Sequence, residues 1–412
     1  MTETGVDVAA KSDLAVIGAG PVGTALAILA AQAGFSVTLV DARPASAANA
    51  ADTRTFAIVR GSWRLLCATG IAPDLADHIT PLNGLEAEDG GTHWFGAPHA
   101  AFSSDDLATS GQSEALGQMV PARLLQVALD RVAGEMAGLA WLRGARFSGM
   151  TTGPASALIT LEDGRTLEAG LVAACDGIQS AVRTGLGICT EGRAYGKSVF
   201  AADVALDRPH QGIARQLFTP EGPFATLPLP GNRANLAWYM KTGAAETLVK
   251  MPKDAIEAEL NARFEKFAGR MSLDGPPLSY PLVMQIAASM TGPRTALLGD
   301  AARRINPLAG QGLNLGFKDA GALIDVMTEA RGTGLDPGSD VVLARYQEWR
   351  RFDSAATAMA MDLIDRIFSN DNVFLKPLRG LALTIANRAA PLRRALARQA
   401  SADQDHLPSL MR

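Results

Sequence analysis

A short apolar run at residues 13–17 is the first hydrophobic segment of the chain, and a glycine-rich turn follows it directly. An Ala- and Leu-rich stretch continues to residue 33, and a second apolar run covers residues 36–40. Short apolar runs are typical of buried strands, and the longer segment between them has the length and composition of a helix. The pattern therefore predicts a βαβ unit at the start of the chain.

After this unit, the spacing of hydrophobic residues is typical of helices in some segments and of strands in others. A helical period returns at residues 56–68 and again at 121–137, whereas residues 80–112 are rich in turn formers and favour neither element. Residues 140–175 have the pattern of short strands. The last of these strands leads directly into Asp176-Gly177 and a short helix.

Strand patterning dominates residues 198–240, where Pro and Gly turns separate four apolar segments. A helix at residues 253–268 and a strand near 282–288 follow, and the chain is largely helical after Gly310. The predicted fold class is α/β: a Rossmann-like nucleotide-binding domain, an inserted antiparallel β-sheet domain and a helical C-terminus.

Composition and charge narrow the class of protein. The 412 residues are 48% hydrophobic and 19% charged, which is typical of a globular protein of enzyme size, and a net charge of −4 argues against a nucleic-acid partner. Three widely spaced cysteines build neither a disulfide framework nor a zinc site, so we expect no metal and a reducing cytoplasm. The polar N-terminus does not have the pattern of a signal peptide, and no apolar run reaches the roughly 18 residues of a membrane span.

The turn after the first strand carries Gly18-x-Gly20-x-x-Gly23. In such a turn the first glycine permits a tight bend, the second lets the backbone approach a pyrophosphate, and the third permits close packing of helix on strand. The helix N-terminus adds a partial positive charge. Asp41 ends the next strand, where a carboxylate accepts hydrogen bonds from an unphosphorylated ribose, so the motif predicts NAD or FAD rather than NADP at this position.

Two further motifs, together with this one, resemble the class A flavoprotein monooxygenases, the group with the para-hydroxybenzoate hydroxylase fold. Cys175-Asp176-Gly177-x-x-Ser180-x-x-Arg183 resembles the DG motif of that family. Gly299-Asp300-Ala301-Ala302 followed by the run from Pro307 to Gly316, PLAGQGLNLG, resembles its GD motif and, more specifically, the ubiquinone-biosynthesis hydroxylase branch.

The resemblance implies FAD as the cofactor and NAD(P)H as a co-substrate. Asp300 is then expected to accept hydrogen bonds from the ribityl hydroxyls, and Pro307 to fix a loop over the isoalloxazine ring. Backbone amides at the start of the helix that follows are expected to face the N1–C2=O edge of the flavin, since a helix N-terminus stabilises an anion. The residues expected at this end of the cofactor are Asp300, Pro307, Gly310, Gln311, Gly312, Leu313 and Asn314.

Three further predictions each have a structural alternative. The resemblance implies that Asp176 and Gly177 contact the cofactor, although Asp176 is also placed to cap the short helix after it. It implies that Arg54 and Arg123 lie near FAD, where a guanidinium suits a pyrophosphate, and the alternative for each is a surface or helix N-terminal arginine.

The chain departs from the branch at two positions. Many members carry histidines where this chain has Arg303 and Asn306. This puts in doubt any contact to the flavin or substrate that depends on those histidines.

The chemistry is assigned to the cofactor. None of the five histidines falls in a triad or metal-ligand spacing, and no GxSxG occurs, so no catalytic side chain is assigned. The resemblance implies that reduced flavin activates O₂ at its C4a position and that one oxygen atom passes to a phenol ring. Pro307 and Gln311 are the residues expected in the loop near the reacting ring, and the aromatic residues of the inserted sheet are expected to cover the substrate.

The segment 376–398 carries six basic residues and no acidic one among leucines and alanines. Two interpretations stay open. A basic amphipathic segment binds an anionic membrane surface or a quinone-biosynthesis complex, which places a cytoplasmic protein at the periphery of the inner membrane. Alternatively, it is a solvated helix packed on the nucleotide-binding domain.

The leading functional hypothesis is an FAD-dependent aromatic-ring hydroxylase that uses NAD(P)H and O₂ on a polyprenylated phenol in ubiquinone biosynthesis. The alternatives are a hydroxylase of the same fold acting on a soluble phenol or secondary metabolite, and a non-catalytic flavoprotein scaffold of a biosynthetic complex. We expect the FAD-binding domain to comprise residues 1–80, 113–197 and 291–330, the substrate domain 81–112 and 198–290, and the C-terminal helical region 331–412.

Overall fold

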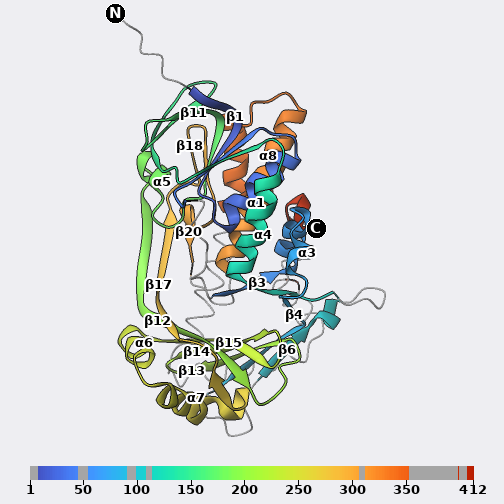
Figure 1. The fold of residues 1–412 in the computed structure, drawn as a ribbon, viewed down its shortest axis with the longest axis vertical. Coiled ribbons are helices and arrows are strands. Elements are labelled where there is room, and N and C mark those ends of the chain that lie inside the picture. The colour runs from blue at the N-terminus through green and yellow to red at the C-terminus, as the bar shows by residue number, and fades with distance from the viewer. Residues whose placement is uncertain are drawn as a thin grey trace, which may run out of the picture.

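A mainly parallel sheet forms one end of the molecule, in a computed structural model that describes residues 8–44, 54–90, 99–107, 114–305, 311–351, 398 and 406–412 (Figure 1). Its strands lie in the order β18-β19-β11-β1-β2-β8, and β19, β11, β1, β2 and β8 pair in parallel. The carboxyl ends of these five strands therefore meet at one edge. The strands are β1 (Val8–Ile17), β2 (Val37–Asp41), β8 (Leu139–Arg143), β11 (Thr166–Ala174), β18 (Thr291–Gly292) and β19 (Thr295–Leu297), with β9 (Phe147–Thr152) and β10 (Ala157–Leu161) added in antiparallel pairing.

Three long helices lie side by side against this sheet (Figure 1). They are α1 (Pro21–Gln32), α4 (Ala122–Glu135) and α8 (Gln311–Gly332). Their apolar side chains and those of the sheet form one core, in which Leu14, Leu26 and Phe317 are fully buried. Residues 340–351 form a further helix, and shorter ones are α2 (Arg60–Ala68), α3 (Ala72–Leu75), α5 (Ala181–Gly185), η1 (Ser104–Leu107), η2 (Gly299–Ala301) and η4 (Ser409–Met411).

A second sheet forms the other end, with the strand order β20-β17-β12-β15-β14-β13-β5-β6. Two of its strands, β12 and β17, are long and connect the two ends of the molecule (Figure 1). Helices α6 (Thr242–Val249) and α7 (Lys253–Ala268) cover its outer face. The strands are β5 (Gly84–Asp89), β6 (His99–Ser103), β12 (Thr190–Leu206), β13 (Ile213–Thr219), β14 (Gly222–Leu229), β15 (Arg233–Lys241), β17 (Leu278–Ala287) and β20 (Arg303–Arg304), and β16 (Met271–Leu273) pairs with β12.

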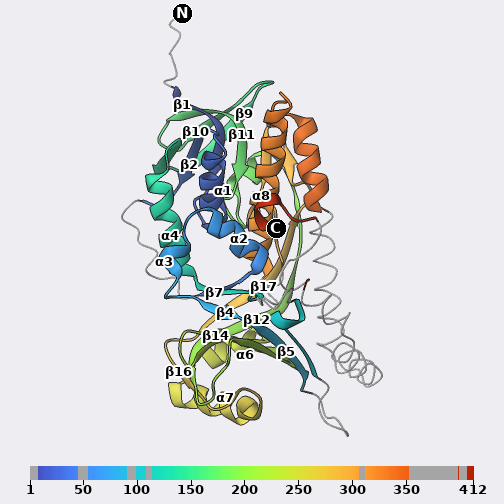
Figure 2. The same cartoon turned by 90° about the vertical axis from the view of Figure 1, so that its right-hand side faces the viewer.

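A small sheet of β3 (Thr55–Val59), β7 (Gly117–Pro121) and β4 (Thr80–Leu82) lies between the two ends (Figures 1 and 2). It brings the start of α2 and of α4 to the edge at which the parallel strands end. The small sheet therefore helps to position the side chains at that edge.

The two faces of the second sheet have different partners. Phe224 stacks on Phe264 of α7 with ring centroids 3.7 Å apart, and Trp238 meets the same ring edge-on at 4.9 Å. Tyr239 lies on the opposite face of the sheet. Of the aromatic residues expected to cover the substrate, Phe200, Phe224 and Trp238 are thus core, because side chains alternate along each strand.

The predicted fold class is confirmed, and two local predictions need correction. Residues 56–68 are not one helix: β3 occupies Thr55–Val59, because its β-branched and aromatic residues pair with β7, and α2 begins at Arg60. The inserted sheet is mostly antiparallel, but β13 pairs with β5 in parallel. β5 and β6 come from the turn-rich stretch 80–112, where the sequence predicts neither helix nor strand, since short half-buried strands carry little periodic signal.

Candidate functional site

The three glycine-containing motifs follow three neighbouring parallel strands. Gly18 follows β1, Asp176 follows β11, and Gly299 follows β19. Backbone hydrogen bonds keep these strand ends in register, from Cys175 N to Ile17 O at 2.8 Å and from Leu298 N to Ala174 O at 3.0 Å. Segments far apart in the chain thus meet at the carboxyl edge of the sheet, the usual ligand site of an open α/β sheet.

The three glycines of the first motif have different surroundings. Gly18 has a φ of +102°, and a Cβ there would lie 2.4 Å from Cys175 O; a Cβ on Gly23 would lie 1.9 Å from Gly18 O. No atom lies within 4 Å of a Cβ placed on Gly20. Gly18 and Gly23 are therefore required by the fold itself, whereas Gly20 faces open space, as a residue does when its backbone approaches a ligand.

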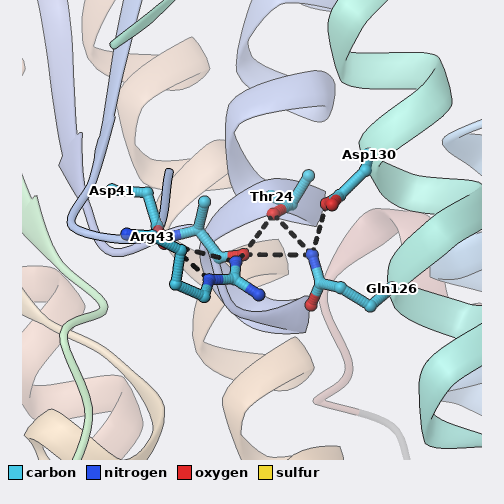
Figure 3. Close-up of polar contacts among 6 residues, drawn as sticks. Thr24, Asp41, Arg43, Gln126 and Asp130 are labelled. Atoms are coloured by element: carbon cyan, nitrogen blue, oxygen red, sulfur yellow. Dashed lines mark hydrogen bonds and ion pairs between the residues drawn. The ribbon is translucent and has the colours of Figure 1, made fainter. Parts of the chain in front are cut away.

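Asp41 is placed as predicted at the end of β2, but the protein already engages its carboxylate (Figure 3). One oxygen accepts a hydrogen bond of 2.6 Å from Ala19 N, and the other accepts bonds from Arg43 N at 2.7 Å and Arg43 Nε at 2.9 Å. Asp41 is 7% exposed. The hydrogen bonds of Asp41 hold the turn after β1 in place. A ribose hydroxyl bound here would share this carboxylate with Arg43.

A polar network missed by sequence reasoning holds the same turn from the other side (Figure 3). The carbonyl oxygen of Ala19 accepts hydrogen bonds from Gln126 Nε2 and Thr24 Oγ1, both at 3.0 Å. Gln126 also bonds to Asp130, whose pKa is raised by desolvation in spite of this hydrogen bond and of the charges of Arg43 and Arg143. A lone glutamine on an amphipathic helix carries no sequence signal of this role.

Ser180 is the N-cap residue of the short helix α5, and Asp176 supports the same helix end, because its Oδ2 accepts a hydrogen bond of 3.1 Å from Val182 N. Its Oδ1 is buried and has no hydrogen-bond partner in the described part of the chain. An unsatisfied buried carboxylate oxygen is rare and needs a donor, which a ligand at this edge would supply. Gly177, with a φ of +81°, makes the turn that places this carboxylate.

Arg183 connects the DG and GD motifs. It is buried, and its guanidinium donates to Ile178 O at 2.7 Å and to Ala301 O at 2.8 Å. The last residue of the DG pattern thus acts as a clamp between two turns rather than as a ligand contact.

Asp300 projects from the turn after β19 and is exposed at the site. No hydrogen bond or ion pair to its carboxylate occurs within the described residues. Desolvation by the surrounding protein raises the pKa of Asp300, against the opposing charges of Arg304, Arg54 and Arg303. The side chain is open to a ligand and sits among cations, which suits an acceptor for sugar-type hydroxyl groups.

Arg54 and Arg123 are brought together. Arg54 precedes β3, Arg123 lies in the first turn of α4, and Ala122 N donates to Arg54 O at 2.9 Å. Both side chains are exposed. The Arg54 guanidinium lies 5.4 Å from the ring centroid of Phe56. Their assignment to the cofactor stays a prediction.

The start of α8 is only partly described. Pro307, Gly310 and Asn306 lie outside the described residues, and of Gln311 only the backbone is described. Gly312 has open space where a Cβ would stand, and Leu313 is half-buried.

Asn314 has a structural role that the sequence did not indicate. Its Oδ1 accepts from Val59 N at 3.0 Å, and its Nδ2 donates to Ala57 O at 2.8 Å. The side chain bridges α8 to β3 and is buried, so its two hydrogen bonds hold the start of α8 against β3.

Arg303, one of the two departures from the branch, points into the protein. Its Nη2 lies 2.8 Å from Asp319 Oδ1, and Arg350 Nε lies 2.7 Å from the same oxygen. The other oxygen of Asp319 accepts from Gly299 N at 3.0 Å. Arg303, Asp319 and Arg350 are at most 4% exposed, so this buried triad supports the GD turn from behind.

The residues present fit a bound FAD. Three observations carry the fit: the open space over Gly20, the orphaned Oδ1 of Asp176, and the unengaged carboxylate of Asp300. They lie at one edge of the sheet, next to the N-terminus of α1, whose first amides lack intrahelical acceptors. In the described ranges, no group of three or more His, Cys, Asp or Glu side chains is arranged to hold a metal ion.

Comparisons with known proteins agree with this fit. Residues 11–359 match the model of the FAD binding domain family. The chain is 35% identical over 394 residues to ubiquinone hydroxylase UbiL of Rhodospirillum rubrum, covering 94% of this chain and 89% of that protein. It is 34% identical over 401 residues to the 3-demethoxyubiquinol 3-hydroxylase of Escherichia coli, covering 93% and 96%.

Solved structures share the fold. The p-nitrophenol 4-monooxygenase PnpA of Pseudomonas putida superposes with a TM-score of 0.75 at 17% identity, covering 95% of this chain and 97% of that one. PqsL of Pseudomonas aeruginosa, described as a probable FAD-dependent monooxygenase, gives 0.70 at 20% identity, covering 94% and 100%.

The fold is that of a flavoprotein, and the residues at the carboxyl edge of the parallel sheet fit its nucleotide. The chain belongs to the FAD binding domain family and, within it, to the FAD-dependent monooxygenases that include the ubiquinone hydroxylases. It is an oxidoreductase with FAD as cofactor and NAD(P)H, typical of this family, as co-substrate.

Proposed function

We propose that this monooxygenase hydroxylates the aromatic ring of a polyprenylated phenol in ubiquinone biosynthesis, with NAD(P)H and O₂ as co-substrates. The observation that carries the proposal is the similarity along more than nine-tenths of the chain to proteins named ubiquinone hydroxylase and 3-demethoxyubiquinol 3-hydroxylase. The three motifs at one sheet edge supply the cofactor site that such a reaction needs.

The side chains of this chain bind and orient rather than react. The turn at Gly18–Gly23 and the N-terminus of α1 receive the pyrophosphate, and Asp41 and Asp176 offer carboxylate oxygens to hydroxyl groups. Asp300 does the same at the flavin end. FAD, when bound, supplies the reduction of O₂ that ring hydroxylation requires.

The inner face of the second sheet is where we place the substrate ring. This face carries Val199, Tyr239, Tyr280 and Leu282 and lies opposite the face that α7 covers. An apolar wall excludes water from the reacting ring and suits a lipid-like tail.

Two measurements test the proposal together. In the source organism, deletion of the gene is expected to cause an under-hydroxylated polyprenylphenol to accumulate, detected by mass spectrometry of the quinone pool. With purified holoenzyme, the same phenol is expected to stimulate NAD(P)H oxidation with a matching yield of hydroxylated product.

Other outcomes identify the alternatives. A normal quinone profile together with efficient turnover of a soluble phenol indicates a hydroxylase of other phenolics. Flavin that NAD(P)H does not reduce under any of these conditions indicates a non-catalytic scaffold. NAD(P)H oxidation that yields only hydrogen peroxide rules out the phenol used.

We further propose that the basic segment 376–398, of which the structure describes only residue 398, brings the protein to an anionic membrane surface. No helix among the described residues has the length and apolarity to cross a bilayer. A variant with the six basic residues of this segment changed to glutamine is expected to lose co-sedimentation with vesicles containing phosphatidylglycerol, whereas the wild-type chain retains it at low salt. Equal sedimentation of both chains would overturn this proposal.

A further inference from the structure

Ala19 is held on both sides of its Cα, although it lies in the turn between β1 and α1. Its N–H donates to Asp41 Oδ2 at 2.6 Å. Its carbonyl oxygen accepts hydrogen bonds from three side chains, Thr24 and Gln126 at 3.0 Å and Arg43 (Figure 3). Thr24 lies in α1, Gln126 in α4, and Arg43 just after β2. A carbonyl oxygen has two lone pairs, so this one receives more donors than it needs, and they come from three separate elements.

The carbonyl of Ala19 belongs to the same peptide group as the N–H of Gly20. No cis peptide bond occurs among the described residues, and in a planar trans peptide the C=O and the N–H point in opposite directions. The three donors therefore also set the direction of the Gly20 N–H, which points away from them. This N–H makes no hydrogen bond to a described residue, and no atom lies within 4 Å of a Cβ placed on Gly20. The N–H is thus left for a ligand at the N-terminus of α1.

The backbone of Gly20 does not itself prevent the opposite orientation of this peptide. The φ of Gly20 is −69°, and a half turn of the peptide group would carry it to about +110°, a value that glycine adopts readily and other residues rarely. The turned peptide would present a carbonyl oxygen to a pyrophosphate and repel it. The hydrogen bonds to Ala19 O therefore keep a donor, rather than an acceptor, on the ligand side of the turn.

The amide of Gln126 is in turn oriented by Asp130, one turn further along α4 (Figure 3). Besides Ala19 O, the neighbours of Gln126 Nε2 are Asp130 Oδ1 at 2.5 Å and Thr24 Oγ1 at 3.4 Å. A carbonyl and a carboxylate oxygen only accept, so the amide fits with its nitrogen toward them, and the turned amide would place its oxygen against both. Gln126 is 4% exposed, which leaves little room for water to replace either bond.

We propose that Gln126 and Asp130 are positioning residues for FAD. Asp130 orients the Gln126 amide, and Gln126 holds the Ala19–Gly20 peptide with its N–H toward the pyrophosphate. Both residues act through the turn, which is preorganised for the ligand and does not have to reorient when FAD binds. The inference concerns the cofactor alone and is independent of which phenol is the substrate.

Titration of the apoprotein tests the role of Gln126. The two probes are FAD, followed by its fluorescence, and ADP, which carries the pyrophosphate without the flavin and is measured by competition. Gln126→Met has a similar length and no donor, and it is expected to raise both dissociation constants roughly three- to tenfold, the effect of one lost neutral hydrogen bond. Thr24→Val removes a second donor from the same carbonyl and is expected to act in the same way. Glu135→Gln, at the exposed end of α4, is the matched control and is expected to bind both probes as wild type does.

Two substitutions of Asp130 separate positioning from packing. Asp130→Leu removes the acceptor and is expected to weaken both probes roughly two- to fivefold, whereas Asp130→Asn keeps an acceptor oxygen for Gln126 Nε2 and is expected to restore wild-type affinity. The double variant Gln126→Met, Asp130→Leu is expected to bind no more weakly than Gln126→Met alone, because Asp130 acts through Gln126.

Thermal unfolding of each apoprotein shows which variants are folded before the titrations are compared. Unchanged affinity for FAD and ADP in folded Gln126→Met and Thr24→Val would overturn the proposal. So would weaker binding of FAD with unchanged binding of ADP, because the network would then act at the flavin end. Additive losses in the double variant, or equal losses in Asp130→Leu and Asp130→Asn, would show that Asp130 does not act by orienting Gln126.

Discussion

At the scale of single residues, two glycines of the first motif test different properties. Substitution of Gly23 tests the stability of the fold, and substitution of Gly20 tests the binding of FAD. Gly23→Ala places a methyl group 1.9 Å from Gly18 O and is expected to destabilise the protein by at least 1–3 kcal/mol, the usual cost of overpacking. Gly20→Ala meets no protein atom within 4 Å, so its apoprotein is expected to unfold at the wild-type temperature while its affinity for FAD falls. Thermal unfolding of the two apoproteins measures the change in stability, and fluorescence titration with FAD measures the change in affinity. Wild-type FAD affinity in Gly20→Ala would contradict the placement of the pyrophosphate.

The buried triad gives a residue-scale prediction with a pH signature. Burial alone raises the pKa of Asp319, but the guanidiniums of Arg303 and Arg350 outweigh it and hold this pKa below the ordinary value. The ionised carboxylate therefore contributes stability above the unfolded pKa of about 3.9, and this contribution is lost as the pH falls through the folded pKa. Asp319→Asn leaves two guanidiniums without their carboxylate and is expected to cost about 3–5 kcal/mol at pH 7.

Urea unfolding between pH 3 and 7 measures this effect. The difference in unfolding free energy between wild type and Asp319→Asn is expected to stay constant down to about pH 5 and to shrink below about pH 4. The triple variant Arg303→Met, Asp319→Leu, Arg350→Met is the control, because removing all three charges is expected to recover much of the loss. A difference that is independent of pH would show that Asp319 is not ionised in the folded protein.

At the scale of elements, the parts with a strong local signal could be predicted and the parts that depend on pairing could not. Glycine spacing, a helix of good length and an acidic strand end identify the βαβ unit, and the structure has them within a few residues of the predicted positions. The local pattern predicts a helix at β3 because the partner strand β7 lies some 60 residues away in the chain, beyond the reach of any local pattern.

The same limit applies to side chains. Gln126, Asn314, Arg303 and Arg183 each act through backbone carbonyls or a buried carboxylate that only tertiary contact supplies. Sequence spacing identifies the residues that face a ligand more readily than those that hold the turns in place, since the latter have no characteristic neighbours in the chain.

Arg183 connects the DG turn to the GD turn, because its guanidinium donates hydrogen bonds to both. Arg183→Met leaves the carbonyl oxygen of Ala301 without its buried donor and that of Ile178 with only the long bond from Gln285, and is expected to cost about 1–3 kcal/mol. Hydrogen exchange followed by mass spectrometry is expected to show faster exchange in the two turns, with strand β2 unchanged. Arg64, a half-buried arginine of α2 paired with Glu114, serves as the control, and Arg64→Met is expected to leave the exchange of both turns as in wild type. Unchanged exchange in Arg183→Met would mean that the two turns are held independently.

At the scale of the whole molecule, long-range contacts join the cofactor edge to both ends of the protein. β12 and β17 run from the cofactor end to the second sheet, and β20, directly after the GD turn, is the edge strand of that sheet (Figure 1). Arg350, from the helix at residues 340–351, reaches the same turn through Asp319. The second sheet and the GD turn are therefore connected through β12, β17 and β20.

The last residues of the chain, 406–412, close on the cofactor domain, and this decides how membrane attachment has to be tested. Leu407 and Met411 are 1% exposed, and Ser409 N donates to Asp325 of α8 at 2.7 Å. Leu407→Ala is expected to destabilise the protein by about 2–5 kcal/mol, as for other buried leucines, with His406→Ala near wild type as the exposed control. Urea unfolding measures the stability of both variants.

A truncation at residue 370 removes this anchor together with the basic segment 376–398, so a loss of membrane binding in that variant would not separate unfolding from electrostatics. Wild-type stability of Leu407→Ala would mean that the segment is not anchored in solution, and truncation would then be a fair test.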